Sequence, residues 1–381
     1  MRLNRRQFLI LTGMVSGCTI AHRGDRTSKQ SNPSNPTKVP LNPAPPGLFA
    51  PPRGDLRIVV ISDFNSAYGS TTYEPEVDRA IALIPDWQPD LVIAGGDMVA
   101  GQKLSLTPEN IQAMWEAFDI HVASKLREAG LPFGFTIGNH DGSGALDADG
   151  QLKFLQDRNI AAEYWQNPQH DPLLNFIDRR HFPFYYSFRV HSALKKQDIF
   201  CLVWDASTAK MPEQQLAWVE ESLASPVAEQ AKLRIAIGHL PLYAVAVGRN
   251  KPGEILDNAE MLRGLLERYG VHTYISGHHH AYFPGHRGQL QMLHAGAIGG
   301  GPRQLLNSDL PPQKTLTVVD IQLATDSTTY STYDLKTLEL VDIRELPRII
   351  IGINGMELRR DISWDALTPE ERSLCSDQLC K

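Results

Sequence analysis

Five short polar motifs, each directly after a run typical of a buried β-strand, constrain the fold of this chain more than any other feature. The motifs are Asp63-Phe64-Asn65, Gly95-Gly96-Asp97, Gly138-Asn139-His140-Asp141, Gly238-His239 and Gly277-His278-His279-His280. In open α/β sheets, ligands bind at the carboxyl ends of the strands. We therefore expect side chains from these motifs to converge on one site, although the motifs lie far apart in the sequence.

The segments around the motifs alternate between strand-like and helix-like patterns. Short runs rich in β-branched residues predict buried strands, and apolar positions repeated every three or four residues predict helices. Strands are expected at 57–62, 90–94, 131–137, 233–237, 271–276 and from 316 to about 341, and helices at 77–83, 111–129, 214–223 and 259–269. The runs 181–188 and 198–206 could pair as a hairpin. This alternation predicts an α/β fold whose first strands are largely parallel.

Composition limits the choice of function. The chain has 381 residues, of which 42% are hydrophobic, so a sizeable core can form. Its formal net charge is −6 and no long run of Lys and Arg stands out, which does not favour capture of a nucleic-acid backbone. We therefore predict no nucleic-acid binding. A local cluster of metal ions would still attract phosphate.

The first residues have the features of an export signal. Asn4-Arg5-Arg6-Gln7-Phe8-Leu9 resembles a twin-arginine signal, and the apolar run 8–15 is too short to span a bilayer, which needs about 20 residues. Val15-Ser16-Gly17-Cys18 resembles the lipobox of bacterial lipoproteins, whose Cys carries lipid. We expect residues 1–18 to be a signal peptide and a lipid on Cys18 to hold a periplasmic lipoprotein at the extracytoplasmic face of a bacterial membrane. The alternative is a plain signal peptide with an incidental Cys.

The side chains in the five motifs are typical of a metal centre. Carboxylates, imidazoles and amide oxygens suit Mn, Fe and Zn, and the lack of Cys in the motifs argues against a structural zinc site. The glycines allow sharp turns, so that short Asp and Asn side chains can point into a shared cavity. A carboxylate that bridges two ions holds them about 3.5–4 Å apart, as in two-metal phosphatases.

In this order, the motifs resemble those of the calcineurin-like metallophosphoesterase family, which are D-x-H, G-D, G-N-H-[DE], H and G-H-x-H. The resemblance covers residues 56–280 in motif order. It implies an α/β fold built as an α/β/β/α sandwich of two mixed β-sheets flanked by helices. It also implies a hydrolase that acts on a phosphomonoester or phosphodiester with two divalent or trivalent metal ions, Mn, Fe or Zn, as cofactors.

The resemblance further implies a role for each motif residue. Asp63, Asn65 and His280 would bind one ion, Asp97 would bridge both ions, and Asn139, His239 and His278 would bind the second. His140 would face the scissile phosphate and protonate the leaving oxygen, and Asp141 would orient His140 through a hydrogen bond. A water activated by the ions would attack phosphorus, so no separate protein base is needed. His279 would point away from the site if its segment is extended.

Two positions depart from the family and leave other functions open. Asn65 stands where the family has His, and its amide oxygen is a weaker metal ligand than imidazole. Ala100 stands where purple acid phosphatases have a metal-binding Tyr, so the chain is not expected to be one of them. The alternatives are a non-catalytic, metal-containing binding module of the same fold, with Asn65 as its mark, and a lipoprotein that stores or delivers metal.

The remaining sequence predicts the domain layout. Residues 19–54 are rich in Pro, Ser and Asn and are expected to form an extended tether, followed by the metallophosphoesterase domain at 55–342 and a C-terminal extension at 343–381. In the extension, Cys375 and Cys380 could form a small disulfide loop. Asp205 could line the cleft or cap a turn, and the run Gly296–Gly301 could cradle phosphate or simply turn the chain. Substrate specificity is expected in the loops 147–178 and 245–258.

Overall fold

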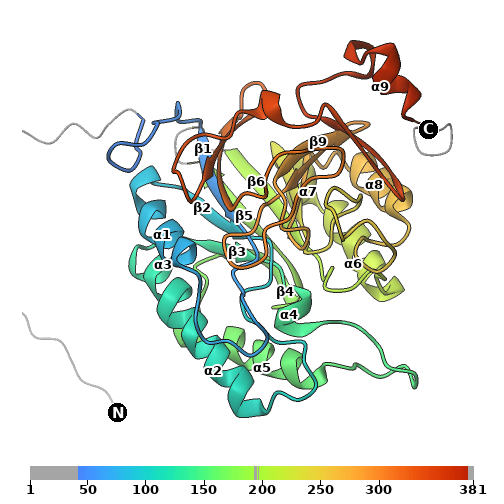
Figure 1. The fold of residues 1–381 in the computed structure, drawn as a ribbon. Coiled ribbons are helices and arrows are strands. Elements are labelled where there is room, and N and C mark those ends of the chain that lie inside the picture. The colour runs from blue at the N-terminus through green and yellow to red at the C-terminus, as the bar shows by residue number, and fades with distance from the viewer. Residues whose placement is uncertain (1–41, 193–194, 196, 376–381) are drawn as a thin grey trace, which may run out of the picture. The chain divides into compact units, whose positions relative to one another are not determined.

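Two β-sheets lie at the centre of the fold (Figure 1), in a computed structural model that describes residues 42–192, 195 and 197–375. The strands of the smaller sheet are β1 (Leu56–Ile61), β2 (Leu91–Ala94), β3 (Phe133–Phe135), β11 (Thr315–Gln322) and β12 (Ser327–Asp334). This sheet has five strands in the order β12-β11-β1-β2-β3. Because β1, β2 and β3 are parallel, their carboxyl ends lie at the same edge of the sheet.

The larger sheet has nine strands in the order β13-β14-β9-β10-β8-β7-β6-β5-β4. The bounds of these strands are β4 (Asn175–His181), β5 (Tyr185–Ser192), β6 (Gln197–Val203), β7 (Leu233–Ile237), β8 (Thr273–Ser276), β9 (Phe283–Arg287), β10 (Leu290–His294), β13 (Ile349–Gly352) and β14 (Gly355–Arg359). The central strands β6, β7, β8 and β10 are parallel, and both flanks are antiparallel. Both sheets are therefore mixed, as the sequence predicts.

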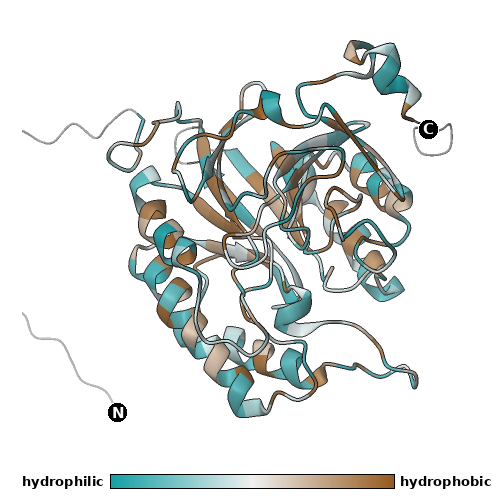
Figure 2. Cartoon of the chain, viewed as in Figure 1, coloured by the Kyte–Doolittle hydropathy of each residue, from teal (hydrophilic) through white to brown (hydrophobic). Residues whose placement is uncertain are grey.

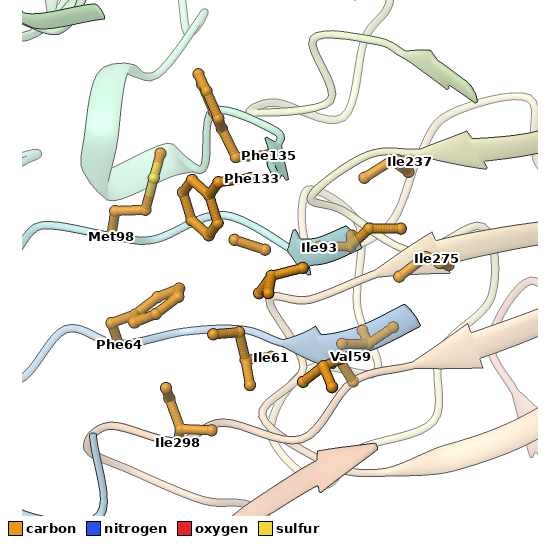
Figure 3. Close-up of a cluster of buried hydrophobic side chains, with 14 of the residues drawn as sticks. Val59, Ile61, Phe64, Ile93, Met98, Phe133, Phe135, Ile237, Ile275 and Ile298 are labelled. Carbon is orange, nitrogen blue, oxygen red and sulfur yellow. The ribbon is translucent and has the colours of Figure 1, made fainter. Parts of the chain in front are cut away.

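An apolar layer joins the two sheets, and a second one covers the outer face of the larger sheet. Alternate residues of β6 show this division, because side chains of a strand point to opposite faces in turn. Ile199, Cys201 and Val203 join the cluster that contains β1–β3, whereas Phe200 and Leu202 pack with the helices on the other face. Figure 3 shows part of the inner layer, with Ile93 of β2 close to Ile237 and Ile275 of the larger sheet.

Helices cover the outer faces of the two sheets. Their bounds are α1 (Pro75–Leu83), α2 (Pro108–Phe118), α3 (Ser124–Glu128), α4 (Asn139–Gly142), α5 (Leu155–Gln166), α6 (Glu213–Leu223), α7 (Pro226–Gln230), α8 (Ala259–Arg268) and α9 (Pro369–Ser373), and short turns of other helix types lie at Ile84–Trp87, Asp119–Ala123, Pro168–His170, Ile343–Glu345 and Trp364–Ala366. Figure 1 shows α1, α2, α3 and α5 on one side and α6, α7 and α8 on the other. Figure 2 shows both hydrophilic and hydrophobic residues along the helices, whereas the strands between them are largely hydrophobic. With the apolar clusters described above, this confirms the α/β/β/α sandwich.

The observed elements match most of the predicted ones, with differences at their ends. The hairpin expected from 181–188 and 198–206 is the antiparallel pair β5 and β6. The helix expected at 111–129 is interrupted by a π turn, Asp119–Ala123. There the Ser124 hydroxyl donates to the carbonyl of Asp119 at 2.6 Å, which competes with regular helical hydrogen bonding.

A fully buried arginine ties the smaller sheet together. Arg57 of β1 is 0% exposed, and its Nε and Nη2 donate to the carboxylate of Asp320 on β11 at 2.9 and 3.1 Å. Its remaining donors reach the carbonyl oxygens of Pro43, Trp87 and Pro51. A buried charge is tolerated only when it is paired and its hydrogen bonds are satisfied, and Arg57 meets both conditions.

The contacts of Arg57 also correct the expected tether. Residues 42–54 do not extend away from the domain, because the carbonyl groups of Pro43 and Pro51 accept hydrogen bonds from Arg57, and the hydroxyl of Tyr333 donates to the carbonyl of Phe49. Composition alone predicts a tether here because it gives no sign of these acceptors. The expected signal peptide, Cys18 and the tether up to residue 41 lie outside the described residues.

The segment after residue 342, which we assigned to a C-terminal extension, adds two strands to the larger sheet. β14 pairs with β9 through Leu358 and His286, and the buried carboxylate of Glu357 on β14 lies 2.9 Å from Nε2 of His294 on β10. Cys380, the expected partner of Cys375, lies outside the described residues. Within 42–192, 195 and 197–375, no helix combines the length and apolar character needed to cross a membrane.

Replacing Arg57 by Ala should lower the free energy of unfolding by about 3–5 kcal/mol, because the Asp320 carboxylate would stay buried without its partner. The matched control is Arg53→Ala. Arg53 pairs with Asp90 at 2.8 Å but keeps 23% of its side chain exposed, so its loss should change the free energy by less than about 1 kcal/mol. Urea denaturation followed by circular dichroism measures both. Equal small effects would contradict a central role for Arg57.

Candidate metal centre and active site

The five motifs meet where the carboxyl ends of the strands in both sheets approach one another. The N–H of Asp63, after β1, donates to the carbonyl of Gly96, after β2, at 3.0 Å. In the larger sheet, the N–H of Gly277, after β8, donates to the carbonyl of His239, after β7, also at 3.0 Å. The N–H of His278 reaches across to the Asp63 carboxylate at 3.1 Å. The two sheets therefore bring side chains from all five motifs into one region.

One group of candidate ligands surrounds Nε2 of His239, which is fully buried. Asn139 Oδ1 lies 2.9 Å from this nitrogen, Asp97 Oδ2 lies 3.3 Å from it, and His278 Nδ1 also lies 3.3 Å from it. Asp97, His239 and His278 have the mutual spacing of a metal-binding group. The hydrogen bond from Asn139 Nδ2 to Gln102 Oε1, at 2.6 Å, turns the amide oxygen towards the group.

A second group shares Asp97 with the first. Asp63, Asp97 and His280 again have the spacing of a metal-binding group, and His280 Nε2 lies 3.2 Å from Asp63 Oδ1. Asn65 is buried beside them, since its backbone N–H donates to the carbonyl of Asp97 at 3.2 Å. Asp97 thus lies where a bridging carboxylate is expected.

Each histidine of the two ligand groups uses one ring nitrogen for a hydrogen bond outside the group. Its other ring nitrogen faces the group and can bind a metal. Nδ1 of His239 lies 2.7 Å from the carbonyl oxygen of Gly95, and Nδ1 of His280 lies 3.0 Å from that of Gly300. Because a carbonyl only accepts, each Nδ1 carries the proton, and Nε2 is the atom available for a metal. In His278 the roles are reversed, because Nε2 lies 2.8 Å from the carboxylate of Glu254.

The charges of the site fit a cation. Burial raises the pKa of Asp97, but the imidazoles of His239 and His140 outweigh it and hold the pKa well below its usual range. Burial lowers the pKa of His239, but Asp97 outweighs this and raises it to about 9. The same negative field that attracts a proton to His239 attracts a metal ion, and the two compete for Nε2.

The pair of His278 and Glu254 has a defined protonation state. Burial lowers the pKa of His278 to about 4 against the opposing bond to Glu254. Burial raises the pKa of Glu254, but hydrogen bonds from His278 and Arg249 lower it to about 2. At neutral pH the ring is therefore neutral and the carboxylate ionised, so Nε2–H donates to Glu254 and the Nδ1 lone pair faces the metal group. Carboxylate, imidazole and amide donors converge in this way on a site suited to Mn, Fe or Zn.

The backbone is strained at four of the candidate ligands. Asp63, Asp97, His278 and His280 have φ values of 51°, 54°, 64° and 51°, in the left-handed region that side chains other than Gly rarely adopt. The packing is close as well, because a Cβ at Gly138 would overlap the backbone nitrogen and a carboxylate oxygen of Asp97. Strain of this kind persists where the surrounding structure fixes the geometry of a functional site.

His140 faces the metal groups, but the residue that orients its ring is not the predicted one. Its backbone N–H donates to Asp97 Oδ1 at 2.9 Å, and its Nδ1 lies 3.2 Å from the carbonyl of Gly101, which leaves Nε2 towards the site. The predicted hydrogen bond from Asp141 is wrong. The Asp141 carboxylate accepts from the N–H groups of Val99 and Gly138, at 2.9 and 2.8 Å. The tight turn after His140 points the Asp141 side chain inward. Asp141 therefore holds together the loops that carry Asp97 and Asn139.

Three other expectations can be compared with the structure. His279 points away from the metal groups, as predicted, and contacts the N–H of Val245 and the carbonyl of Glu254. Asp205 binds Arg158 at 2.7 Å and accepts from the N–H and hydroxyl of Ser207, so it takes the structural role. The N–H groups of Gly299 and Gly300 are used by the carbonyl groups of Asp63 and Asn65, so these amides are not available to cradle a phosphate.

Sequence reasoning missed several residues that support the site. Glu254 orients His278 and Gln102 orients Asn139. The ring of Tyr68, which is 56% exposed, lies 5.0 Å from the ring of His140. The Ser62 hydroxyl donates to Asp63 at 2.6 Å. Only Ser62 adjoins a motif. Glu254 falls in the loop 245–258, which we had singled out for specificity, but nothing in its local pattern points to His278.

Changing Glu254 to Gln should weaken metal binding at the group of Asp97, His239 and His278 by roughly 10- to 100-fold, because the orienting carboxylate is lost. Competition with a chelator of known affinity measures this, and thermal denaturation checks the fold. Glu109→Gln, on the exposed first turn of α2, removes the same charge far from the motifs and should leave the affinity unchanged. An unaltered affinity in Glu254→Gln would show that His278 does not need this partner.

Several solved structures are similar to this chain at low sequence identity, and one of them has a TM-score above 0.5. Purple acid phosphatase PPD1 from yellow lupin (Lupinus luteus) seeds is 15% identical, with a TM-score of 0.53 over 77% of this chain and 54% of its own. This chain thus spans about half the length of the lupin protein. GAP50, the anchor in the inner membrane complex of Plasmodium, is 16% identical, with a TM-score of 0.46 over 75% of this chain and 87% of its own. A putative 5'-nucleotidase from Staphylococcus aureus is 13% identical, with a TM-score of 0.41 over 84% of this chain and 57% of its own.

The sequence comparison identifies the family. No curated protein matches the chain. Residues 56–282, more than half of the chain, match the family of calcineurin-like phosphoesterases, and all five motifs lie within this range. The chain therefore belongs to the calcineurin-like phosphoesterase family.

Proposed function

We propose that this chain hydrolyses a phosphomonoester or phosphodiester with two metal ions, outside the cytoplasm. The observation that carries the proposal is the pair of ligand groups that share Asp97, with Nε2 of His140 4.0 Å from Asp97 Oδ2. Two such groups with one common carboxylate are the arrangement expected of a two-metal hydrolase.

Each metal position has its own ligands in this proposal. Asp63, Asn65, His280 and Asp97 would hold one ion, and Asp97, Asn139, His239 and His278 would hold the other. Bound there, the ions would lower the pKa of a water molecule and offset the negative charge of the phosphate. The protein's own part is to fix these donors, through Gly95, Gly300 and Glu254, before the substrate arrives.

In this proposal, His140 protonates the leaving group. Its side chain is 15% exposed, so a substrate can reach it. Because the Gly101 carbonyl engages Nδ1, the nitrogen that faces the site is Nε2. A protonated Nε2 would stabilise charge on the phosphoryl group and then donate its proton to the leaving oxygen, which is general acid catalysis.

Export is part of the proposal and rests on the sequence before the domain. The arginine pair Arg5-Arg6, the short apolar run after it and the lipobox-like segment ending at Cys18 support a twin-arginine route and a lipid anchor. A twin-arginine route carries folded proteins, so the metal ions could be loaded before export. Mass spectrometry of the mature N-terminus tests this step, and an unmodified Cys18 retained in the chain would contradict the anchor.

A second function, a non-catalytic binding module, follows from one observation. Asn65 offers an amide oxygen where the family pattern has an imidazole. A weaker ligand lowers the affinity of the first position, and a protein that bound phosphoesters without turnover would tolerate this. Bound metal together with no cleavage of any ester in a broad panel would support this alternative.

Activity on p-nitrophenyl phosphate and bis-p-nitrophenyl phosphate should disappear after chelation and return with Mn²⁺, Fe²⁺ or Zn²⁺. In His140→Ala, turnover should fall by about 10²- to 10⁴-fold, because the general acid is lost. Metal content, measured by mass spectrometry of the ions, should stay at the wild-type value. His191→Ala removes a ring that is 53% exposed and paired with Asp198, and it should be fully active. Unchanged turnover in His140→Ala would remove this residue from the mechanism.

A further inference from the structure

Arg303 lies beside the metal ligands, and its charge has no evident structural use. Its backbone N–H donates to the carbonyl oxygen of His280 at 2.9 Å, which fixes the residue next to that ligand. Its Nε is buried without a hydrogen-bond partner. Across residues 42–192, 195 and 197–375, no carboxylate pairs with its guanidinium. An arginine held in this way is available to bind an anion.

A short antiparallel ladder brings a second arginine to the same place. Ala246 bridges Leu305, and the N–H of Val247 donates to the carbonyl of Gln304 at 2.9 Å. The next position along the ladder places Gly248 opposite Arg303, and a Cβ added to Gly248 would lie 3.2 Å from Arg303 Nη1. Arg249 follows Gly248 directly, and its charge acts on Arg303 at the end of the ladder that adjoins His280.

Several cations share a single directly paired carboxylate at this end of the ladder. Arg249 pairs with Glu254, and the same carboxylate binds His278 and lies 3.7 Å from Lys251. Burial and the charge of Arg249 lower the pKa of Arg303, and they outweigh the opposing effect of the Glu254 and Asp63 carboxylates. One carboxylate therefore pairs with two neighbouring cations and an imidazole, while Arg303 adds a positive charge without an ion pair of its own among the described residues.

We propose that Arg303 binds the phosphoryl group of the substrate and that this substrate is a phosphomonoester. The inference rests on the proposed hydrolase function. Guanidinium groups bind phosphate oxygens through charge-assisted hydrogen bonds. A monoester carries about −1.5 to −2 charges on its phosphoryl group at neutral pH, whereas a diester carries a single negative charge. A cation beside the metal centre that has no ion pair of its own therefore favours the monoester, and a partly buried cation is screened little by salt.

Calorimetric titration of the Mn²⁺-loaded protein with inorganic phosphate tests the binding directly. Arg303→Gln should raise the dissociation constant for phosphate roughly tenfold or more, and Arg303→Lys should recover part of the affinity. The control is Arg268→Gln, which removes the same charge from a side chain that is 65% exposed on α8 and should bind phosphate like the wild type. Wild-type affinity in Arg303→Gln, or an equal loss in Arg268→Gln, would overturn the proposal.

Kinetics on the two ester types test the substrate class. Arg303→Gln should lower kcat/KM for p-nitrophenyl phosphate about tenfold and for bis-p-nitrophenyl phosphate clearly less, with metal content unchanged. An equal or larger loss on the diester would overturn the monoester assignment. If the wild type cleaves neither ester but binds phosphate through Arg303, the hydrolase proposal fails and the anion site stands. If it cleaves esters but Arg303→Gln binds phosphate normally, only the anion site fails.

Discussion

The position of Asp97 between two groups of imidazoles and carboxylates is the constraint on which the rest of the site depends. This carboxylate follows β2, yet it lies within ligand distance of residues that follow β1, β7 and β8. Such an arrangement is possible only if the two sheets are held face to face with their parallel strands ending at the same edge. The apolar layer that contains Ile93, Ile237 and Ile275 performs this task, and its packing therefore sets the distance between the ligand groups (Figure 3).

Bringing the ligands together costs stability, through strained backbone conformations and through buried like charges. Asp63, Asp97, His278 and His280 adopt left-handed φ values, and two buried carboxylates face each other through Asp97 and Asp63. Strained residues cost of order 1–3 kcal/mol each, and they persist only where the surrounding structure over-determines them. Here the surrounding hydrogen bonds are unusually complete. Carbonyl oxygens of Gly95 and Gly300, and the carboxylate of Glu254, each fix one imidazole. The strained backbone thus lowers local stability, and in return the ligand atoms are held in position before a cation binds.

Much of this arrangement could be predicted from the sequence, because each ligand lies directly after the strand that positions it. Each ligand motif follows a short β-branched run, and the glycines inside the motifs mark the turns, so β1, β2, β7 and β8 and the residues after them were predictable. The strand β9 was missed because it contains Pro284 and Gly285, which are uncommon in strands. The hairpin of β13 and β14 was missed although Asn354-Gly355 is a recognised turn signal. Residues 42–54, which composition assigned to a tether, pack on the domain because Arg57 binds the carbonyl groups of Pro43 and Pro51, contacts that composition cannot reveal.

The residues that orient the ligands could not be predicted, because they lie far from the ligands in the sequence. The bonds from His278 to Glu254 and from Asn139 to Gln102 join segments that approach only after folding. The wrong assignment of Asp141 shows the same limit. Adjacency in the chain favoured a bond to His140, but the tight turn directs the Asp141 carboxylate to the N–H groups of Val99 and Gly138. Spacing in the sequence therefore identifies candidate ligands, whereas the contacts that orient them depend on tertiary structure.

The most direct test of the shared carboxylate is the number of metal ions per chain, measured by inductively coupled plasma mass spectrometry on wild type, Asp63→Ala, His239→Ala and Asp97→Ala. If Asp97 belongs to both groups, the wild type should hold two ions, Asp63→Ala and His239→Ala should each lose one, and Asp97→Ala should lose both. Retention of one ion in Asp97→Ala, with all variants folded, would contradict the account, because the two groups would then be independent of this carboxylate.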